Sequence, residues 1–217
     1  MKLKACILAA TAVAALASAA GAVEPIVSFT FEPIEGGYDP RLSPTSVYNS
    51  IPGPYAAFPA ATGSLGFEDY TSVASTSPTF VLAQMRFVGG VSTAGESLRF
   101  QFFDATSSPF SSFTVGPLGA GNFIYTITLG TVALGGKDST FVVPTIGELE
   151  IFTAGAGLGQ FFLTATPPAV GSSSLLVGST GGPTNTFNHA FELRQVPAPG
   201  ALALLGLGGI VAARRRR

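Results

Sequence analysis

Residues Asn122–Leu129, with the sequence NFIYTITL, alternate large apolar side chains with polar ones. One set of alternate positions holds Phe123, Tyr125, Ile127 and Leu129, and the other holds Thr126 and Thr128. Successive side chains of a β-strand point to opposite faces, so a period of two predicts a strand with one face in a hydrophobic core.

The same period of two returns along most of the chain. It is found in Ile26–Phe31, Phe80–Val88, Ser97–Phe103, Thr140–Val143, Glu148–Thr153, Gln160–Thr166, Ser174–Val177 and Thr186–Arg194. Glycine-rich turns separate many of these runs, and no segment combines helical spacing with helix caps. We therefore expect an all-β body over residues 23–195, of the β-sandwich or jelly-roll type.

Residues 32–77 have a different composition, with six prolines and four of the five tyrosines of the chain. A long proline-rich stretch inside a compact domain predicts an irregular segment, either an ordered functional loop or a cover over one sheet edge. The tyrosines of this segment are the candidates for stacking on a sugar ring, since the chain has no tryptophan. They are Tyr38, Tyr48, Tyr55 and Tyr70. The alternative is that they only cover the sheet edge.

The first 22 residues have the layout of a secretory signal peptide. Lys2 and Lys4 precede the apolar run Ala5–Leu16, and small residues follow at the positions that signal peptidase reads. The apolar run is too short to span a bilayer as a helix. The single cysteine, Cys6, lies inside this segment, so the exported body is expected to contain no disulfide.

The last 22 residues combine a short proline motif, an apolar run and a cluster of arginines. The motif and the cluster consist of Val196, Pro197, Ala198, Pro199, Gly200, Arg214, Arg215, Arg216 and Arg217. Residues 199–213 between them predict a short transmembrane helix, and the positive-inside rule keeps the arginines in the cytoplasm. A simple membrane anchor is one interpretation of this tail.

This tail also resembles the PEP-CTERM sorting signal of exported bacterial proteins, which the resemblance places at residues 196–217. It implies processing by an exosortase-type membrane protease and an association with exopolysaccharide and the biofilm matrix. Ala198 stands where the family usually has glutamate, so the tail is a Pro-Ala-Pro variant.

Charge limits the partners of the exported body. Only 11% of the chain is charged, against roughly 25% in a typical soluble domain. Without the signal and the tail, 5 basic and 12 acidic residues remain, for a net charge of −7. An acidic body excludes nucleic acid as a partner and remains compatible with neutral glycans or bound calcium.

The chain carries few residues that support catalysis. Its one histidine, His189, lies between Phe187 and Phe191 on a predicted strand, where a hydrogen-bonded, half-buried residue is expected rather than a base or a metal ligand. No nucleophile, zinc or phosphate-binding motif is present. Glu148 and Glu150 would share one solvated strand face. We expect no enzymatic activity and no cofactor.

Structural calcium remains an alternative. Glu32 follows the first predicted strand and Glu192 lies on the last one, an arrangement that resembles carbohydrate-binding modules of the jelly-roll type. Such modules often hold a structural calcium ion near their paired chain ends. The resemblance makes Glu32 and Glu192 candidate ligands.

Together these features predict a structural or adhesive protein of the cell surface or extracellular matrix. Its expected partners are signal peptidase, an exosortase-type protease, the inner membrane before processing, and exopolysaccharide. Before processing, the C-terminal helix would hold it in the inner membrane. The alternative is a carbohydrate-binding module with structural calcium, carried by the same tail.

Overall fold

A computed structural model describes residues 26–33, 46–56, 60–74, 77–130, 141–164, 166–173, 177–178 and 187–195. The predicted signal peptide and the predicted sorting tail lie outside these residues. None of the described residues belongs to a helix long and apolar enough to cross a membrane.

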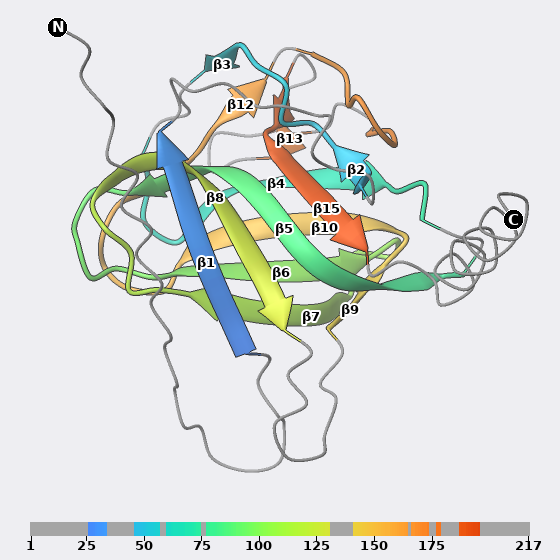
Figure 1. Ribbon diagram of the computed structural model, residues 1–217, viewed down its shortest axis with the longest axis horizontal. Helices are drawn as coiled ribbons and strands as arrows, with labels where there is room; N and C mark the ends of the chain where they lie inside the picture. The colour runs from blue at the N-terminus through green and yellow to red at the C-terminus, as the bar shows by residue number, and fades with distance from the viewer. Residues whose placement is uncertain are drawn as a thin grey trace, which may run out of the picture.

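The described residues form strands that pair antiparallel throughout, which confirms the all-β class (Figure 1). The strands are β1 (Ile26–Pro33), β2 (Ser46–Asn49), β3 (Tyr55–Ala56), β4 (Ser64–Thr71), β5 (Thr79–Val91), β6 (Leu98–Asp104), β7 (Pro109–Val115), β8 (Gly121–Gly130), β9 (Val142–Pro144), β10 (Ile146–Thr153), β11 (Gly159–Phe161), β12 (Leu163–Thr164), β13 (Val177–Gly178), β14 (Asn188–His189) and β15 (Phe191–Gln195).

Two large sheets and one small sheet organise these strands. The first has the order β1-β8-β5-β15-β2, with β9 and β11 pairing the two ends of the long strand β5. The second has the order β13-β4-β10-β6-β7, and the small sheet has the order β14-β12-β3. Figure 1 shows β1, β8, β5 and β15 crossing in front of β4, β10, β6 and β7.

The core lies between the two large sheets. The Phe87 ring of β5 stacks on Tyr125 of β8 and meets Phe100 of β6 edge-on, with ring centroids 4.9 Å apart in both pairs. Phe100 in turn stacks on Phe113 of β7 at 4.9 Å. Each fully buried phenylalanine contributes roughly 1.5–3 kcal/mol to folding, so this aromatic layer supplies much of the stability of a body without disulfides.

The alternation along Asn122–Leu129 is confirmed in β8, with one addition. Tyr125 and Ile127 are buried between the large sheets, whereas Thr128 is exposed. Ile124, which points to the opposite face, is buried as well, because Val88, Ala190, Tyr55 and Phe162 cover it. β8 is therefore buried on both faces at Ile124 and Tyr125.

The prediction that residues 32–77 are irregular is wrong for the described part of this segment. It contains β2, β3 and the eight-residue strand β4, which pairs with β13 on one side and β10 on the other. Hydrophobic alternation does not reveal β4, because Glu68 occupies a buried position and Phe67 an exposed one. Alternation also fails to reveal β7, because Pro109 and two serines interrupt its apolar pattern.

Two predicted strands each divide between sheets. The run Gln160–Thr166 becomes β11 and β12 on either side of Phe162, and the run Thr186–Arg194 becomes β14 and β15 on either side of Ala190. The amide of Ala190 donates to the carbonyl of Phe162 at 2.9 Å, and the amide of Phe162 donates to Val88 at 3.0 Å. Both segments thus cross between the seven-stranded sheet and the small sheet at the same point, where Phe162 pairs with Ala190.

Candidate functional site

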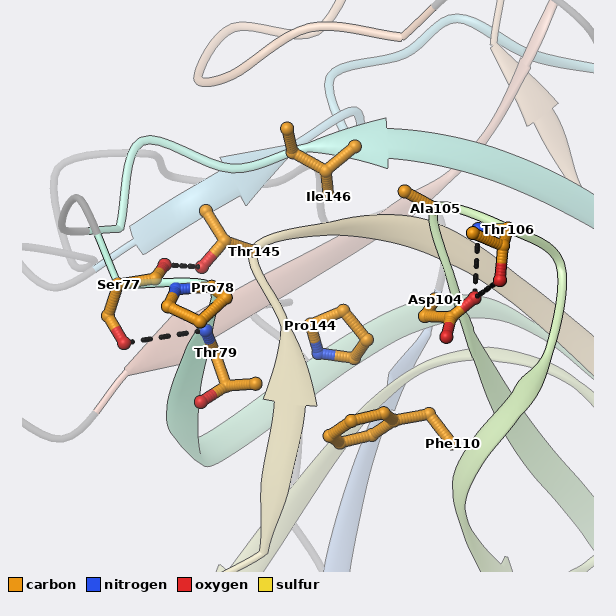
Figure 2. Close-up of a pocket in the computed structure, with 10 residues that line it drawn as sticks. All are labelled: Ser77, Pro78, Thr79, Asp104, Ala105, Thr106, Phe110, Pro144, Thr145 and Ile146. Carbon is orange, nitrogen blue, oxygen red and sulfur yellow. Dashed lines mark hydrogen bonds between the residues drawn. The ribbon is translucent and has the colours of Figure 1, made fainter.

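An open pocket of about 560 Å³ lies where three strand junctions meet (Figure 2). Ser77 and Pro78 precede β5, Asp104 ends β6, and Thr106 belongs to the turn between β6 and β7. Pro144, Thr145 and Ile146 join β9 to β10. The volume falls within the ~300–1,000 Å³ range of small-molecule sites, so this pocket is the leading candidate binding site among the described residues.

The apolar part of the pocket is exposed to solvent. Phe110 near the start of β7 is 45% exposed, and Ile146 at the start of β10 is 53% exposed. Pro144 lies between them in the view of Figure 2. Large apolar side chains at a concave site favour binding, because a ligand that covers them removes apolar area from water.

Asp104 supplies the carboxylate of the pocket. Its Oδ1 atom accepts hydrogen bonds from the amide of Thr106 at 2.8 Å, the hydroxyl of Thr106 at 2.6 Å and the amide of Ser108 at 3.1 Å. These donors, with the Thr106 hydroxyl as the largest contribution, lower the pKa of Asp104 below its ordinary value. The group is therefore ionised at neutral pH.

The second carboxylate oxygen of Asp104 remains available to a ligand. It makes no hydrogen bond within the described part of the chain, and Figure 2 shows it pointing away from Thr106, toward the side where Phe110 lies. Because the turn fixes Oδ1, the other oxygen is held on the side of the pocket where Phe110 lies.

Hydroxyl groups form the opposite rim. The hydroxyl of Thr145 donates to the carbonyl of Ser77 at 2.6 Å, and the amide of Thr145 donates to the carbonyl of Pro78 at 2.9 Å. Both bonds tie the start of β5 to the junction of β9 and β10. The rim is therefore set by backbone as well as by side chains.

The structure places two of the candidate tyrosines in the core. Tyr48 and Tyr70 are 0% and 1% exposed, their ring centroids lie 5.7 Å apart, and Tyr70 donates its hydroxyl proton to the carbonyl of Pro144 at 3.0 Å. Burial raises the pKa of both phenols. A sugar cannot stack on a buried ring, so neither tyrosine forms a binding platform.

Of the other two tyrosines, the structure describes Tyr55, which does not line the pocket. Tyr55 is half-buried in β3 and packs against Val88, Ile124 and Ala190. Tyr38 lies outside the described residues. The exposed aromatic ring of the pocket is Phe110, which sequence patterns did not single out.

The structure does not bring the two calcium candidates together. Glu32 pairs with Ile124 of β8, and Glu192 pairs with Arg86 of β5, so two strands lie between them. Three strand spacings amount to about 14 Å, whereas calcium ligands lie about 2.3–2.6 Å from the ion. Across the described ranges, no group of three His, Cys, Asp or Glu residues is arranged to hold a metal ion.

Glu192 instead lies in a buried ion-pair network. Its carboxylate lies 3.1 Å from the guanidinium of Arg194 and 3.8 Å from that of Arg86. Arg194 also hydrogen-bonds the side chain of Gln84. The network ties β15 to β5.

The other predicted pair of carboxyl groups lies on β10. Glu148 and Glu150 share the partly exposed face of this strand, as expected.

A second polar cluster, which sequence patterns missed, lies deep in the fold. Glu68 of β4 is 0% exposed, and its Oε2 atom accepts a hydrogen bond from the amide of His189 at 2.9 Å. Burial raises the pKa of Glu68 to about 9, so the carboxyl is neutral at pH 7. The nearby Tyr48 phenol is affected by the same carboxyl, which adds to the burial that raises its pKa.

His189 is part of this cluster and is completely buried. Its ring stacks on Phe161 with centroids 4.0 Å apart and planes inclined by 11°. The expectation of a half-buried histidine underestimated its burial. The hydrogen bond from His189 to Glu68 joins β14 to β4. Because Glu68, Tyr48 and His189 are buried, a substrate cannot reach this cluster from solvent.

The predicted sorting residues, from Val196 to Gly200 and from Arg214 to Arg217, lie outside the described residues. A comparison with known families matches residues 195–217 to the PEP-CTERM protein-sorting motif. No curated protein and no solved structure matches the chain. The motif marks an exported protein that is directed to the cell envelope. The chain therefore carries a PEP-CTERM sorting motif, which indicates an exported protein that is sorted by an exosortase system.

Proposed function

We propose that this protein is a structural or adhesive component of the cell surface or extracellular matrix. The observation that carries the proposal is the position of the sorting motif. It begins at Gln195, the last residue of β15, and β15 lies between β5 and β2 in the seven-stranded sheet. The tail that would anchor the protein before processing thus follows directly after an internal strand in the sequence.

This connection suits a protein that bears load. Hydrogen bonds between antiparallel strands lie perpendicular to the strand axes, so a pull along β15 loads the bonds to both neighbours together. The buried pairs of Glu192 with Arg86 and Arg194 add side-chain ties between β15 and β5. We further infer that the two facing sheets form a β-sandwich of the jelly-roll type, which needs no disulfide to hold its shape.

The test is the intact mass and fractionation of the natively expressed protein, in cells with and without the sorting protease. We expect the exported form to lack both the signal and the arginine cluster when the protease is present. A protein that keeps Arg214–Arg217 in the membrane fraction of protease-containing cells would contradict processing of the Pro-Ala-Pro tail. The protein would then be a simple membrane-anchored domain.

The alternative function is that of a carbohydrate-binding module. The pocket beside Phe110 favours it, since it offers an exposed ring, a carboxylate and hydroxyl groups. Bound calcium is part of this alternative, and a calcium-dependent rise in unfolding temperature that is absent in Glu32→Gln would support it. The structure offers no shared site with Glu192.

We also propose that the protein has no catalytic activity, uses no cofactor and does not bind nucleic acid. Glycosidases use a pair of carboxyl groups across the scissile bond. Asp104 is the one carboxylate among the described residues that line the pocket. The net charge of −7, from 5 basic and 12 acidic residues in the exported body, repels a nucleic acid backbone.

A further inference from the structure

We propose that the Phe110 pocket binds one ring of a neutral saccharide, with the sugar stacked on Phe110 and hydrogen-bonded by the free oxygen of Asp104. This inference deepens the adhesive role proposed above and rests on it. It assigns the contact with glycan to the ring of Phe110 rather than to Tyr48, Tyr55 or Tyr70, none of which lines the pocket.

Charge restricts the class of ligand. Asp104 is ionised, and no lysine, arginine or histidine is among the described residues lining the pocket. The body as a whole is acidic, with 12 acidic against 5 basic residues. An anionic ligand would therefore be repelled, and the site fits a neutral or a cationic one.

The arrangement of apolar and polar groups favours the neutral saccharide. A sugar ring has an apolar C–H face and a rim of hydroxyl groups, and the pocket presents the matching parts. Phe110 and Ile146 offer exposed apolar surface, while Asp104 and the hydroxyl groups of Thr106 and Thr145 offer hydrogen-bonding atoms. A lysine or arginine side chain could donate to the same oxygens, but it lacks a ring face of C–H groups that would cover both Phe110 and Ile146.

The site is set before binding, which lowers the cost of capturing a weak ligand. Three donors fix Oδ1 of Asp104, so its free oxygen does not have to be oriented by the ligand. Thr145 is fixed through the carbonyls of Ser77 and Pro78. The polar groups on two sides of the pocket are thus held by backbone bonds.

The test is saturation-transfer NMR on the full-length chain, purified in a detergent that has no sugar head group. The neutral probes are glucose, galactose, mannose and N-acetylglucosamine. Glucuronic acid serves as the anionic probe and n-butylammonium as a mimic of a lysine side chain. We expect at least one neutral sugar to give a saturable signal in the millimolar range, and glucuronic acid to bind more weakly than glucose.

Variants locate the signal. Phe110→Ala should weaken sugar binding by at least about tenfold, because stacking and apolar contact are lost together. Phe110→Tyr, which keeps a ring, should retain binding. Asp104→Asn keeps an Oδ1 acceptor for the turn but removes the charge, and should weaken binding about fivefold. Phe67→Ala is the matched control, since Phe67 is an exposed phenylalanine of the same sheet outside the pocket.

Three results would overturn the inference: no saturable signal with any neutral sugar, equal loss in Phe110→Ala and Phe67→Ala, or binding of n-butylammonium alone. The last result would identify the pocket as a site for basic protein side chains. The mass measurement described above is independent of these results. A correctly sorted protein without sugar binding would refute this inference and leave the surface role intact.

Discussion

The Asp104 pocket and the Glu68 cluster both place a carboxyl group beside aromatic rings, yet the two groups have opposite properties. Asp104 is partly exposed, and its hydrogen-bond donors lower its pKa. Glu68 is fully buried, and burial raises its pKa to about 9. Position relative to the core decides the outcome: the first carboxyl remains charged and available, and the second becomes a neutral hydrogen-bond acceptor inside the fold.

The difference also separates binding from stability. Glu68 holds the amide of His189, 121 residues away along the chain, and so joins two sheets. The hydrogen bonds of Asp104 are confined to its own turn, with Thr106 and Ser108 as partners. We therefore expect changes near Glu68 to alter folding and changes near Asp104 to alter ligand binding.

The largest expected contrast lies within a single strand, β7. Phe113 is 4% exposed and stacks on Phe100, whereas Phe110 is 45% exposed at the pocket. Phe113→Ala should lower the free energy of unfolding by about 3–5 kcal/mol, and Phe110→Ala by less than about 1 kcal/mol. Urea denaturation measures both. Similar losses in the two variants would show that Phe110 belongs to the core and not to a binding surface.

Removal of the Glu68 carboxyl should have the next largest effect. Glu68→Ala leaves the amide of His189 without its acceptor and opens a small cavity, so we expect a loss of about 2–4 kcal/mol. Glu68→Gln keeps an oxygen acceptor and serves as the control with a much smaller loss. Denaturant midpoints of the two variants decide the point, and an unchanged midpoint in Glu68→Ala would contradict the structural role.

Stability should depend on pH through Glu68. The folded protein keeps this proton up to a pKa of about 9, while the unfolded chain releases it near 4.5. The stabilising contribution is therefore complete below pH 4.5 and is lost as pH rises through 9, with a slope of up to ~1.4 kcal/mol per pH unit. Glu68→Gln should flatten the curve between these values. Parallel curves for the wild type and the variant would contradict the raised pKa, because they would show that Glu68 has the same pKa in the folded and unfolded states.

Asp104 should show the smallest effect, with the opposite sign. Its folded pKa lies below the ordinary 3.8, so its contribution to stability is present above 3.8 and is lost as pH falls through the folded value. Asp104→Asn should unfold at a lower temperature than the wild type at neutral pH, and the gap should close on acidification. Thermal unfolding at several acidic pH values measures this gap, and a gap that widens instead would contradict the assignment.

Alternation of side chains predicted the strands whose buried faces are uniformly apolar, such as β8 with Tyr125 and Ile127. It failed for β4, where the buried position 68 carries a carboxyl group, and it could not show that β11 and β12 divide at Phe162. Strand breaks of this kind depend on tertiary contacts, which short patterns do not encode.

The candidate pocket was beyond sequence reasoning for a related reason. Its parts come from Ser77–Thr79, Asp104–Phe110 and Pro144–Ile146, three junctions that only the sheet topology brings together. No motif links them, and Phe110 is one of 18 phenylalanines. The sorting tail was predictable because its proline motif, apolar run and arginines are contiguous, and the family comparison confirms it.

The contrast between the two carboxyl groups can be measured in one sample. The side-chain carboxyl carbons of Glu68 and Asp104 report their ionisation in a carbon-13 NMR titration of the folded protein. We expect Asp104 to titrate below 3.8 and Glu68 to stay protonated through neutral pH, with a pKa of about 9. Titration of Glu68 near its ordinary 4.5 would contradict the account, because that carboxyl would then be solvated and could not serve as a buried link between the sheets.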